Sequence, residues 1–299
     1  MKHKEYIRTD LAAESPSLEK SQAANGVSVD VEKNKSSETA TIKILNKTGE
    51  QDLGKPIGTY ITVSFGKAWN LPEDDIQNVI DTVAEKIKFL ASQLLPNKNE
   101  YSILVVGLGN RYITSDALGP LTVKEITVTR HLQDKSPQLF KMLNQQNVSA
   151  LAPGVLGQTG IETAELIKGA VDTVSPDLVV AIDALAAKSV NRLATTIQIC
   201  DTGITPGSGI GNTKQAINKD TLGVPVIAVG VPTMVSSATL VYDALEKAQV
   251  KDISDELIQV LDNGISFFVT LNETDAVINL LSRILSESID KAFSTASIQ

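Results

Sequence analysis

Short apolar runs alternate along the chain with longer segments whose apolar residues recur every three or four positions. The runs predict strands, and the longer segments predict amphipathic helices. The predicted strands cover residues 60–65, 103–106, 178–182, 197–200 and 224–229. The predicted helices run from about Asn70 to Pro96, from Pro120 to about Arg130, and over residues 163–174, 237–246 and 276–293. Strands that alternate with helices indicate an α/β fold with a mostly parallel twisted sheet and helices on both faces.

Two segments depart from this alternation. Residues 1–58 are polar and poorly periodic, and the run from Glu32 to Thr39 predicts loop or disorder. Residues 202–223 contain five glycines, which predicts a functional loop or a hairpin excursion. We therefore expect a polar, partly flexible region over residues 11–58, followed by a single α/β domain over residues 59–299.

Composition and charge narrow the class of protein. The chain of 299 residues has 27 Lys and Arg against 35 Asp and Glu, and its net charge of −8 disfavours direct nucleic-acid binding. Its one cysteine excludes an intramolecular disulfide, and its two histidines leave too few ligands for a Cys/His zinc site. No apolar stretch reaches 18 residues, and the first residues carry no apolar signal segment, so we expect a cytoplasmic protein that does not contact membranes.

Two aspartates, Asp116 and Asp183, follow two different predicted strands. In an open parallel sheet, ligands bind beyond the carboxyl ends of the strands, so these side chains are placed to converge on one cleft. Two close carboxylates share a proton and supply a general acid and a general base for activating water, and they are also suited to holding a divalent cation. Each aspartate equally fits the N-cap of the following helix, and spacing alone does not separate these options.

Other candidate residues carry weaker signals. The glycine turn after Val106 lacks the third glycine of a dinucleotide-binding fingerprint, because Tyr112 stands at that position, and no cofactor is predicted. Cys200 lies in an apolar strand, where an inert core residue is expected. His131 is expected at the C-terminus of a helix, and Trp69 is expected to anchor packing.

Several longer motifs, in one order between residues 100 and 245, resemble the germination proteases of spore-forming bacteria. The motifs are Gly107-Leu108-Gly109-Asn110, Ser115-Asp116-Ala117-Leu118-Gly119-Pro120, residues 152–160, Ala181-Ile182-Asp183-Ala184-Leu185-Ala186, residues 201–212 and Gly230-Val231-Pro232-Thr233. A series of long motifs is far more specific than a single glycine pattern. Residues 24–55 match no motif of this family.

The resemblance implies an endopeptidase that degrades the small acid-soluble proteins of the spore during germination, in the cytoplasm of the forespore or spore core. It implies an atypical aspartic-type protease whose two essential aspartates match Asp116 and Asp183. It also implies a fold like that of the peptidases that mature hydrogenases, and a homotetramer. The loop over residues 202–212 is rich in backbone N–H groups that suit substrate binding. The candidate substrate-binding residues are Asn110, Thr202, Gly207, Gly209 and Asn212.

The resemblance further implies a zymogen that removes its own short propeptide. The family cuts its substrates after an acidic residue that precedes a hydrophobic residue and alanine. Thr9-Asp10-Leu11-Ala12-Ala13-Glu14 is similar to that pattern. We therefore expect self-cleavage between Asp10 and Leu11, which makes residues 1–10 the candidate propeptide.

Two other functions stay open on the sequence alone. A metal-dependent peptidase, like those that mature hydrogenases, would use the two carboxylates in a metal site, and the shortage of histidine weighs against it. A nonenzymatic module would bind a small molecule or a nucleotide at the glycine turn, and the incomplete fingerprint weighs against that.

Overall fold

The computed structural model describes residues 9–15, 26–98, 100–207, 215–250, 254–263 and 267–295. Within these residues, the strands are β1 (Val27–Lys33), β2 (Ser37–Ile44), β3 (Gly58–Phe65), β4 (Ser102–Gly107), β5 (Asn147–Leu151), β6 (Leu178–Ala186), β7 (Thr196–Cys200), β8 (Val226–Ser236) and β9 (Phe268–Val269). The α-helices are α1 (Lys47–Leu53), α2 (Glu73–Leu94), α3 (Leu118–Glu125), α4 (Arg130–Lys135), α5 (Pro137–Leu143), α6 (Leu156–Thr159), α7 (Thr163–Val174), α8 (Lys219–Leu222), α9 (Ser237–Lys247), α10 (Asp255–Asn263) and α11 (Thr274–Ala292). Short 3-10 helices are η2 (Ala12–Glu14), η3 (Ala68–Asn70), η4 (Thr114–Asp116) and η5 (Val190–Arg192).

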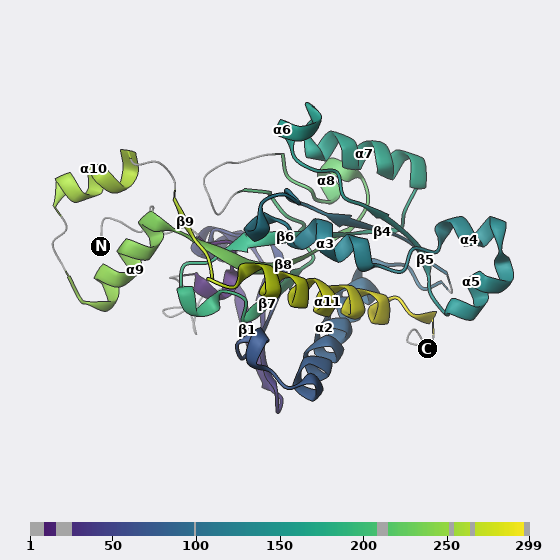
Figure 1. The fold of residues 1–299 in the computed structure, drawn as a ribbon, viewed down its shortest axis with the longest axis horizontal. Helices are drawn as coiled ribbons and strands as arrows, with labels where there is room; N and C mark the ends of the chain where they lie inside the picture. Colours follow the sequence, from purple (N-terminus) through teal and green to yellow (C-terminus); the bar gives the residue numbers. More distant parts are fainter. Residues whose placement is uncertain are drawn as a thin grey trace.

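The strands form one mixed sheet in the order β1-β2-β3-β7-β8-β6-β4-β5, and β9 pairs with the end of β8. Strands β5, β4, β6 and β8 pair in parallel. Strands β1, β2, β3 and β7 pair antiparallel, and β7 joins the two halves by pairing antiparallel with β8. Helices cover both faces, so the predicted α/β class is confirmed (Figure 1). The expected parallel arrangement holds for one half of the sheet.

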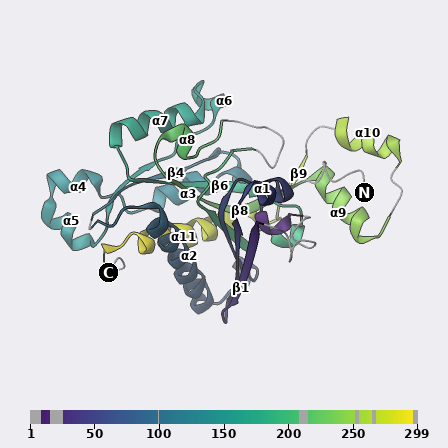
Figure 2. The same ribbon diagram turned by 180° about the vertical axis from the view of Figure 1, so that it is seen from behind.

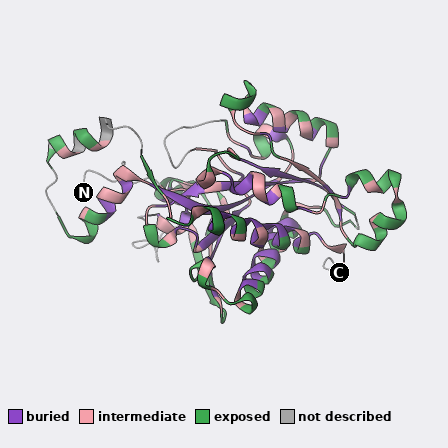
Figure 3. Cartoon of the chain, viewed as in Figure 1, coloured by how far each residue is buried: buried purple, intermediate pink, exposed green. Residues whose placement is uncertain are grey.

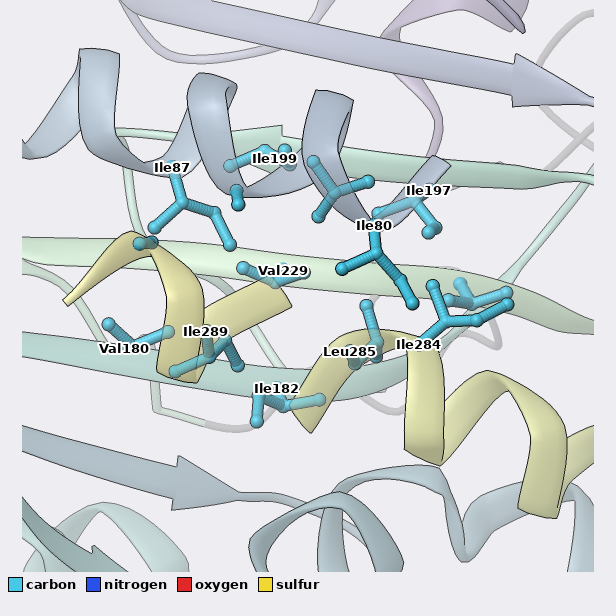
Figure 4. Close-up of a cluster of buried hydrophobic side chains, with 14 of the residues drawn as sticks. Ile80, Ile87, Val180, Ile182, Ile197, Ile199, Val229, Ile284, Leu285 and Ile289 are labelled. Atoms are coloured by element: carbon cyan, nitrogen blue, oxygen red, sulfur yellow. The ribbon is translucent and has the colours of Figure 1, made fainter. Parts of the chain in front are cut away.

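The largest apolar core lies between one face of the sheet and helices α2, α3 and α11. Apolar residues of α2 recur at helical spacing, so they share one side of the helix and are buried against the strands. Figure 4 shows the side chains of α2 and α11 meeting those of β6, β7 and β8. The residues labelled there are Ile80, Ile87, Val180, Ile182, Ile197, Ile199, Val229, Ile284, Leu285 and Ile289.

A different set of helices packs against the opposite face of the sheet. Helices α7 and α8 pack against the parallel half, and α1 and η2 pack against the antiparallel half (Figure 2). Ile103 and Val105 of β4 point into the largest core, whereas Leu104 and Val106 point toward α7. Because both faces of β4 are covered, its sequence is apolar throughout, as predicted.

Two helical pairs lie at opposite ends of the molecule. Helices α4 and α5 extend beyond β5, and α9 and α10 extend beyond the end of β8 (Figure 1). Most residues of α4 and α5 are exposed, in contrast to the buried central strands (Figure 3). No helix in the described part of the chain has the length and apolar character that crossing a membrane requires.

The polar stretch near the N-terminus corrects the sequence analysis. The prediction of loop or disorder from Glu32 to Thr39 is wrong, because these residues lie in β1, β2 and the turn between them. Residues 27–44 therefore extend the sheet of the predicted domain rather than preceding it. Strand β1 lies at the edge and exposes most of its side chains, so its sequence carries little apolar signal.

Some helix ends also differ from the prediction. Helix α3 ends at Glu125, and Arg130 begins a separate helix, so His131 lies in the first turn of α4 rather than at a C-terminus. Helix α2 has Pro72 at its N-cap and no side-chain cap, so neither Asn70 nor Asp74 caps it. The hairpin excursion is confirmed where the chain is described, because Ile204 and Ile217 exchange two backbone hydrogen bonds.

Candidate active site

Asp183 lies inside strand β6, which continues three residues beyond it to Ala186. It pairs with Gly230 of β8 and shares the face of β6 that carries Val179 and Ala181. The expectation that Asp183 follows the strand, and its alternative role as a helix N-cap, are therefore both wrong. The side chain is 7% exposed, and its Oδ1 accepts a hydrogen bond from the N–H of Ala184 at 2.9 Å.

Asp116 ends the 3-10 helix η4, just before α3. Two glycines allow this helix to approach the sheet closely. A Cβ at Gly119 would lie 2.3 Å from the carbonyl oxygen of Leu108, and one at Gly109 would lie 2.1 Å from that of Asp116. Gly109 also has a φ of +110°, which side chains rarely adopt. The glycine turn after Val106 and Gly119 therefore allow η4 and α3 to lie close to β4 and β6.

The carboxylate of Asp116 is held by the turn that precedes it. Its Oδ2 accepts a hydrogen bond from the backbone N–H of Asn110 at 2.7 Å. Ala117 is the N-cap residue of α3, and no side chain caps that helix, so the alternative role of Asp116 as a cap is not realised. Thr233 of β8 donates a hydrogen bond to the carbonyl oxygen of Ser115 at 2.6 Å, which ties η4 to a third element.

Two adjoining cavities contain these residues. The first, of about 330 Å³, is lined by Asp10, Asp183, Lys55 and Gln198 among others. The second, of about 230 Å³, is lined by Asp10, Asp183 and Asp116 among others. The structure therefore brings Asp116 and Asp183 to one cavity, together with Asp10, whose peptide bond to Leu11 is the predicted cleavage site.

The N-terminal segment from Thr9 to Ser15 contacts residues that are distant in the sequence, and its Asp10 lines both cavities. The backbone N–H of Asp10 donates to the carbonyl oxygen of Ala186 at 2.9 Å, and the N–H of Ala186 donates to Asp10 Oδ2 at 2.9 Å. Leu11 and Ala12 are 0% exposed. Leu11 packs with Leu185, and the segment then continues into the 3-10 helix η2.

A carboxylate further along this segment is bound by backbone groups. Glu14 accepts hydrogen bonds from the N–H groups of Lys188 at 2.6 Å and Ser189 at 3.0 Å. Thr9 Oγ1 donates to the same carboxylate at 2.5 Å and accepts from the N–H of Leu11 at 3.1 Å. The segment is thus fixed on both sides of the bond between Asp10 and Leu11.

The remaining predicted site residues are distributed more widely. Thr202 lines the larger cavity, and Gly207 lines both cavities. Asn110 lines neither, and its side chain accepts hydrogen bonds from Tyr112 and Gln158. Gly209 and Asn212 lie outside the described residues.

Three further residues were considered in the sequence analysis, and the structure gives the position of each. His131 is an exposed residue of α4, and Trp69 packs against the largest core. Cys200 is 5% exposed, and burial raises the pKa of its thiol. Among the described residues, no group of three or more His, Cys, Asp and Glu side chains is arranged to hold a metal ion.

Sequence reasoning missed two residues of the larger cavity, Lys55 and Gln198. Gln198 interrupts the otherwise apolar strand β7 and is 7% exposed, so a polar residue in a buried run is a signal that could have found it. Lys55 lies in a polar loop after α1 and has no distinguishing pattern in the sequence.

The geometry defines an α/β protein in which acidic side chains from strand β6 and the 3-10 helix η4 line one small cavity, an arrangement suited to general acid–base hydrolysis. A family model described as germination protease matches residues 5–258. A germination protease of Caldanaerobacter subterraneus subsp. tengcongensis is 48% identical over 250 residues, covering 84% of this chain and 75% of that protein. One of Clostridium acetobutylicum is 38% identical over 315 residues, covering 97% of this chain and 96% of that protein.

The chain belongs to the germination protease family, and its enzyme class is therefore protease. Among solved structures, the [NiFe] hydrogenase maturation protease HycI from Thermococcus kodakarensis is similar to it at 16% identity and a TM-score of 0.37. That match covers 68% of this chain and 98% of the other.

Proposed function

We propose that this protein is an endopeptidase that hydrolyses the small acid-soluble proteins of spores during germination, and that Asp116 and Asp183 activate the attacking water. The observation that carries the proposal is that both aspartates line one cavity together with Asp10, the residue before the predicted cleavage site. The family to which the chain belongs supports the proteolytic part of the proposal.

In the proposed mechanism, no covalent intermediate forms between enzyme and substrate. One aspartate is ionised and takes a proton from water as the water oxygen attacks the scissile carbonyl carbon. The other is protonated and gives its proton to the leaving nitrogen. Two carboxylates from different elements suit this division of roles, because η4 and β6 give them different surroundings.

The protein is proposed to be made as a zymogen that cleaves itself between Asp10 and Leu11. The position of Asp10 supports self-cleavage, because Asp10 and Asp183 line the same two cavities. Mass spectrometry after incubation in mildly acidic buffer tests the site, with a new N-terminus at Leu11 as the expected result. A new N-terminus elsewhere would reject this assignment.

The proposal includes a homotetramer in the spore core, as the family resemblance implies. It includes no cofactor and no direct contact with nucleic acid. The net charge of −8 supports the last point, because a strongly acidic surface repels the phosphate backbone.

The direct test is to incubate the purified, processed protein with a small acid-soluble spore protein and to map the cuts. We expect a few cuts, each after an acidic residue that precedes a hydrophobic residue and alanine. If the spore protein stays intact after prolonged incubation, and casein is not cleaved either, the proposal is overturned.

A further inference from the structure

The carbonyl oxygen of Asp10, which belongs to the predicted scissile bond, accepts two side-chain hydrogen bonds. Gln198 Nε2 donates at 3.0 Å, and Lys55 Nζ donates at 3.1 Å. We propose that Gln198 and Lys55 hold the scissile carbonyl and stabilise the negative charge that develops on its oxygen during hydrolysis. This inference rests on the proposed self-cleavage between Asp10 and Leu11.

The amide of Gln198 contacts the peptide on both sides of Leu11. While its Nε2 donates to the carbonyl oxygen of Asp10, its Oε1 accepts from the N–H of Ala12 at 2.7 Å. The two partners determine the orientation of the amide, because a carbonyl only accepts and an N–H only donates. One rigid side chain therefore fixes the peptide bond that is to be cut, and Leu11 is fully buried between these two contacts.

The sheet register explains how Gln198 and Asp183 reach the same peptide. Gly230 of β8 pairs with Asp183 on one side and with Gln198 of β7 on the other. Directly paired residues place their side chains on the same face, and two strand spacings separate the outer pair by roughly 10 Å. Gly230 contributes no side chain between them, and all three residues line the larger cavity. The side chain of Leu185 covers Gly230, because a Cβ there would lie 2.5 Å from its Cγ. Asp183 and Gln198 therefore lie on either side of a residue that packs with Leu11 of the peptide.

Lys55 is placed by the loop that follows α1. Gly54 ends this helix in the left-handed conformation, at a φ of 66°, and turns the chain toward the N-terminal segment. Tyr60 donates a hydrogen bond from its hydroxyl group to the carbonyl oxygen of Pro56 at 2.9 Å, which fixes the other side of the loop. Burial raises the pKa of Tyr60, so this donor keeps its proton.

The chemical step defines what the two donors do. The water oxygen adds to the carbonyl carbon of Asp10, and the electron pair of the C=O bond moves onto the oxygen. Collapse of this intermediate breaks the bond to the nitrogen of Leu11, which receives a proton, and leaves a new carboxyl group on Asp10. Donors already aligned with the oxygen stabilise the intermediate without reorganising, and losing one such donor typically costs about 10² to 10³ in rate.

Self-cleavage of the full chain tests this role, with the Gln198→Glu and Lys55→Met variants measured beside the wild type. Gln198→Glu keeps the size of the side chain and the acceptor for Ala12, but removes the donor to Asp10. We expect each variant to slow cleavage at Asp10–Leu11 by about 10² or more. Lys55→Arg, which restores a charged donor, should recover most of the rate.

Two further measurements separate this role from simple anchoring and from poor folding. Hydrogen exchange at the N–H of Ala12 reports whether the segment stays bound, and we expect its protection to persist in Gln198→Glu. Lys47→Met, which removes an exposed lysine in α1 that pairs with Glu50, is the matched charge control and should cleave at the wild-type rate.

The outcomes distinguish this inference from the proposed function. If the wild type cleaves at Asp10–Leu11 and Gln198→Glu cleaves equally fast, the inference is overturned and the proposed function stands. Loss of Ala12 protection in proportion to the lost rate would also overturn it, because Gln198 would then act only as an anchor. If the wild type cleaves neither itself nor a peptide with the sequence of residues 4–20, the proposed function fails and the inference fails with it.

Discussion

The parallel and antiparallel halves of the sheet contribute different chemistry to one site. The parallel half supplies the acidic groups, Asp183 from β6 and Asp116 from the turn after β4. The antiparallel half supplies the donors that contact the N-terminal segment, Gln198 from β7 and Lys55 from the loop before β3. The segment lies where the halves meet, at the pairing of β7 with β8. Neither half alone would enclose the bond between Asp10 and Leu11.

The comparison also concerns how each half is stabilised. Strands β4, β6 and β8 of the parallel half are buried on both faces, whereas the outermost antiparallel strand, β1, exposes most of its side chains. The acidic groups therefore lie in closely packed surroundings, and the donors lie on elements that also contact the N-terminal segment. The difference suggests separate tests for the two halves.

The largest expected effect comes from removing an acid of the parallel half. Asp116→Asn and Asp183→Asn should each slow cleavage of the chain by about 10² to 10⁴, because an amide neither takes nor gives the proton. Rates are measured by quantitative mass spectrometry of the released N-terminus. Asp134→Asn, in the exposed helix α4, is the matched control. Cleavage at the wild-type rate in either site variant would show that this carboxylate is not needed.

A second test changes a residue of β8, the strand at which the parallel and antiparallel halves of the sheet meet. A Cβ at Gly230 would lie 2.5 Å from Cγ of Leu185, a residue that packs against Leu11. Gly230→Ala should displace Leu185 and with it the bond to be cut, and a shift of about 1 Å in a reacting group costs about 10² in rate. Circular dichroism verifies that the variant is folded. If the rate of self-cleavage is unchanged, the added methyl group does not displace the residues of the site.

A third test weakens the segment itself. Leu11→Ala removes a fully buried side chain, so the free energy that holds the segment should fall by about 2 to 4 kcal/mol. Hydrogen exchange at the N–H of Ala12 measures this change. Leu45→Ala, at a position 61% exposed, should change it by less than about 0.5 kcal/mol. Equal effects of the two substitutions would contradict the burial of Leu11 in the site.

The smallest expected effect concerns Asp290, a partly buried acid of helix α11 that lies outside the site. Burial raises the pKa of Asp290, whose carboxylate accepts hydrogen bonds from the N–H and hydroxyl of Thr127. A raised pKa means that the folded state binds the proton more tightly, so this group favours folding below its unfolded pKa. That contribution is lost as the pH rises through the folded pKa.

Asp290→Asn should therefore raise Tm relative to the wild type at pH 7, by about 2 °C, and should give little gain at pH 3.5. The amide oxygen still accepts from Thr127. Calorimetry at the two pH values measures the difference. A gain in Tm that is the same at both pH values would show that the charge at position 290 does not affect stability.

The sequence predicted one half of the molecule better than the other. Strands 103–106 and 178–182 were correctly predicted because burial on both faces leaves a continuous apolar run, and both lie inside the observed β4 and β6. Strands β1 and β2 were missed, since an edge hairpin with one exposed side needs no such run. The same difference affected the site: the aspartates of the parallel half were found, and Lys55 of the antiparallel half was not.

The sequence by itself determined the α/β class and the family, and it indicated the two candidate aspartates, because local apolar patterns and long motifs can be identified along the chain. Only the tertiary structure decided that Asp183 lies within a strand and that Asp10 lines both cavities. It alone placed Gln198 and Lys55 on the carbonyl of Asp10. These contacts join residues 45 to 188 positions apart. Sheet register and the pairing of β7 with β8 bring them together, and no local pattern encodes either.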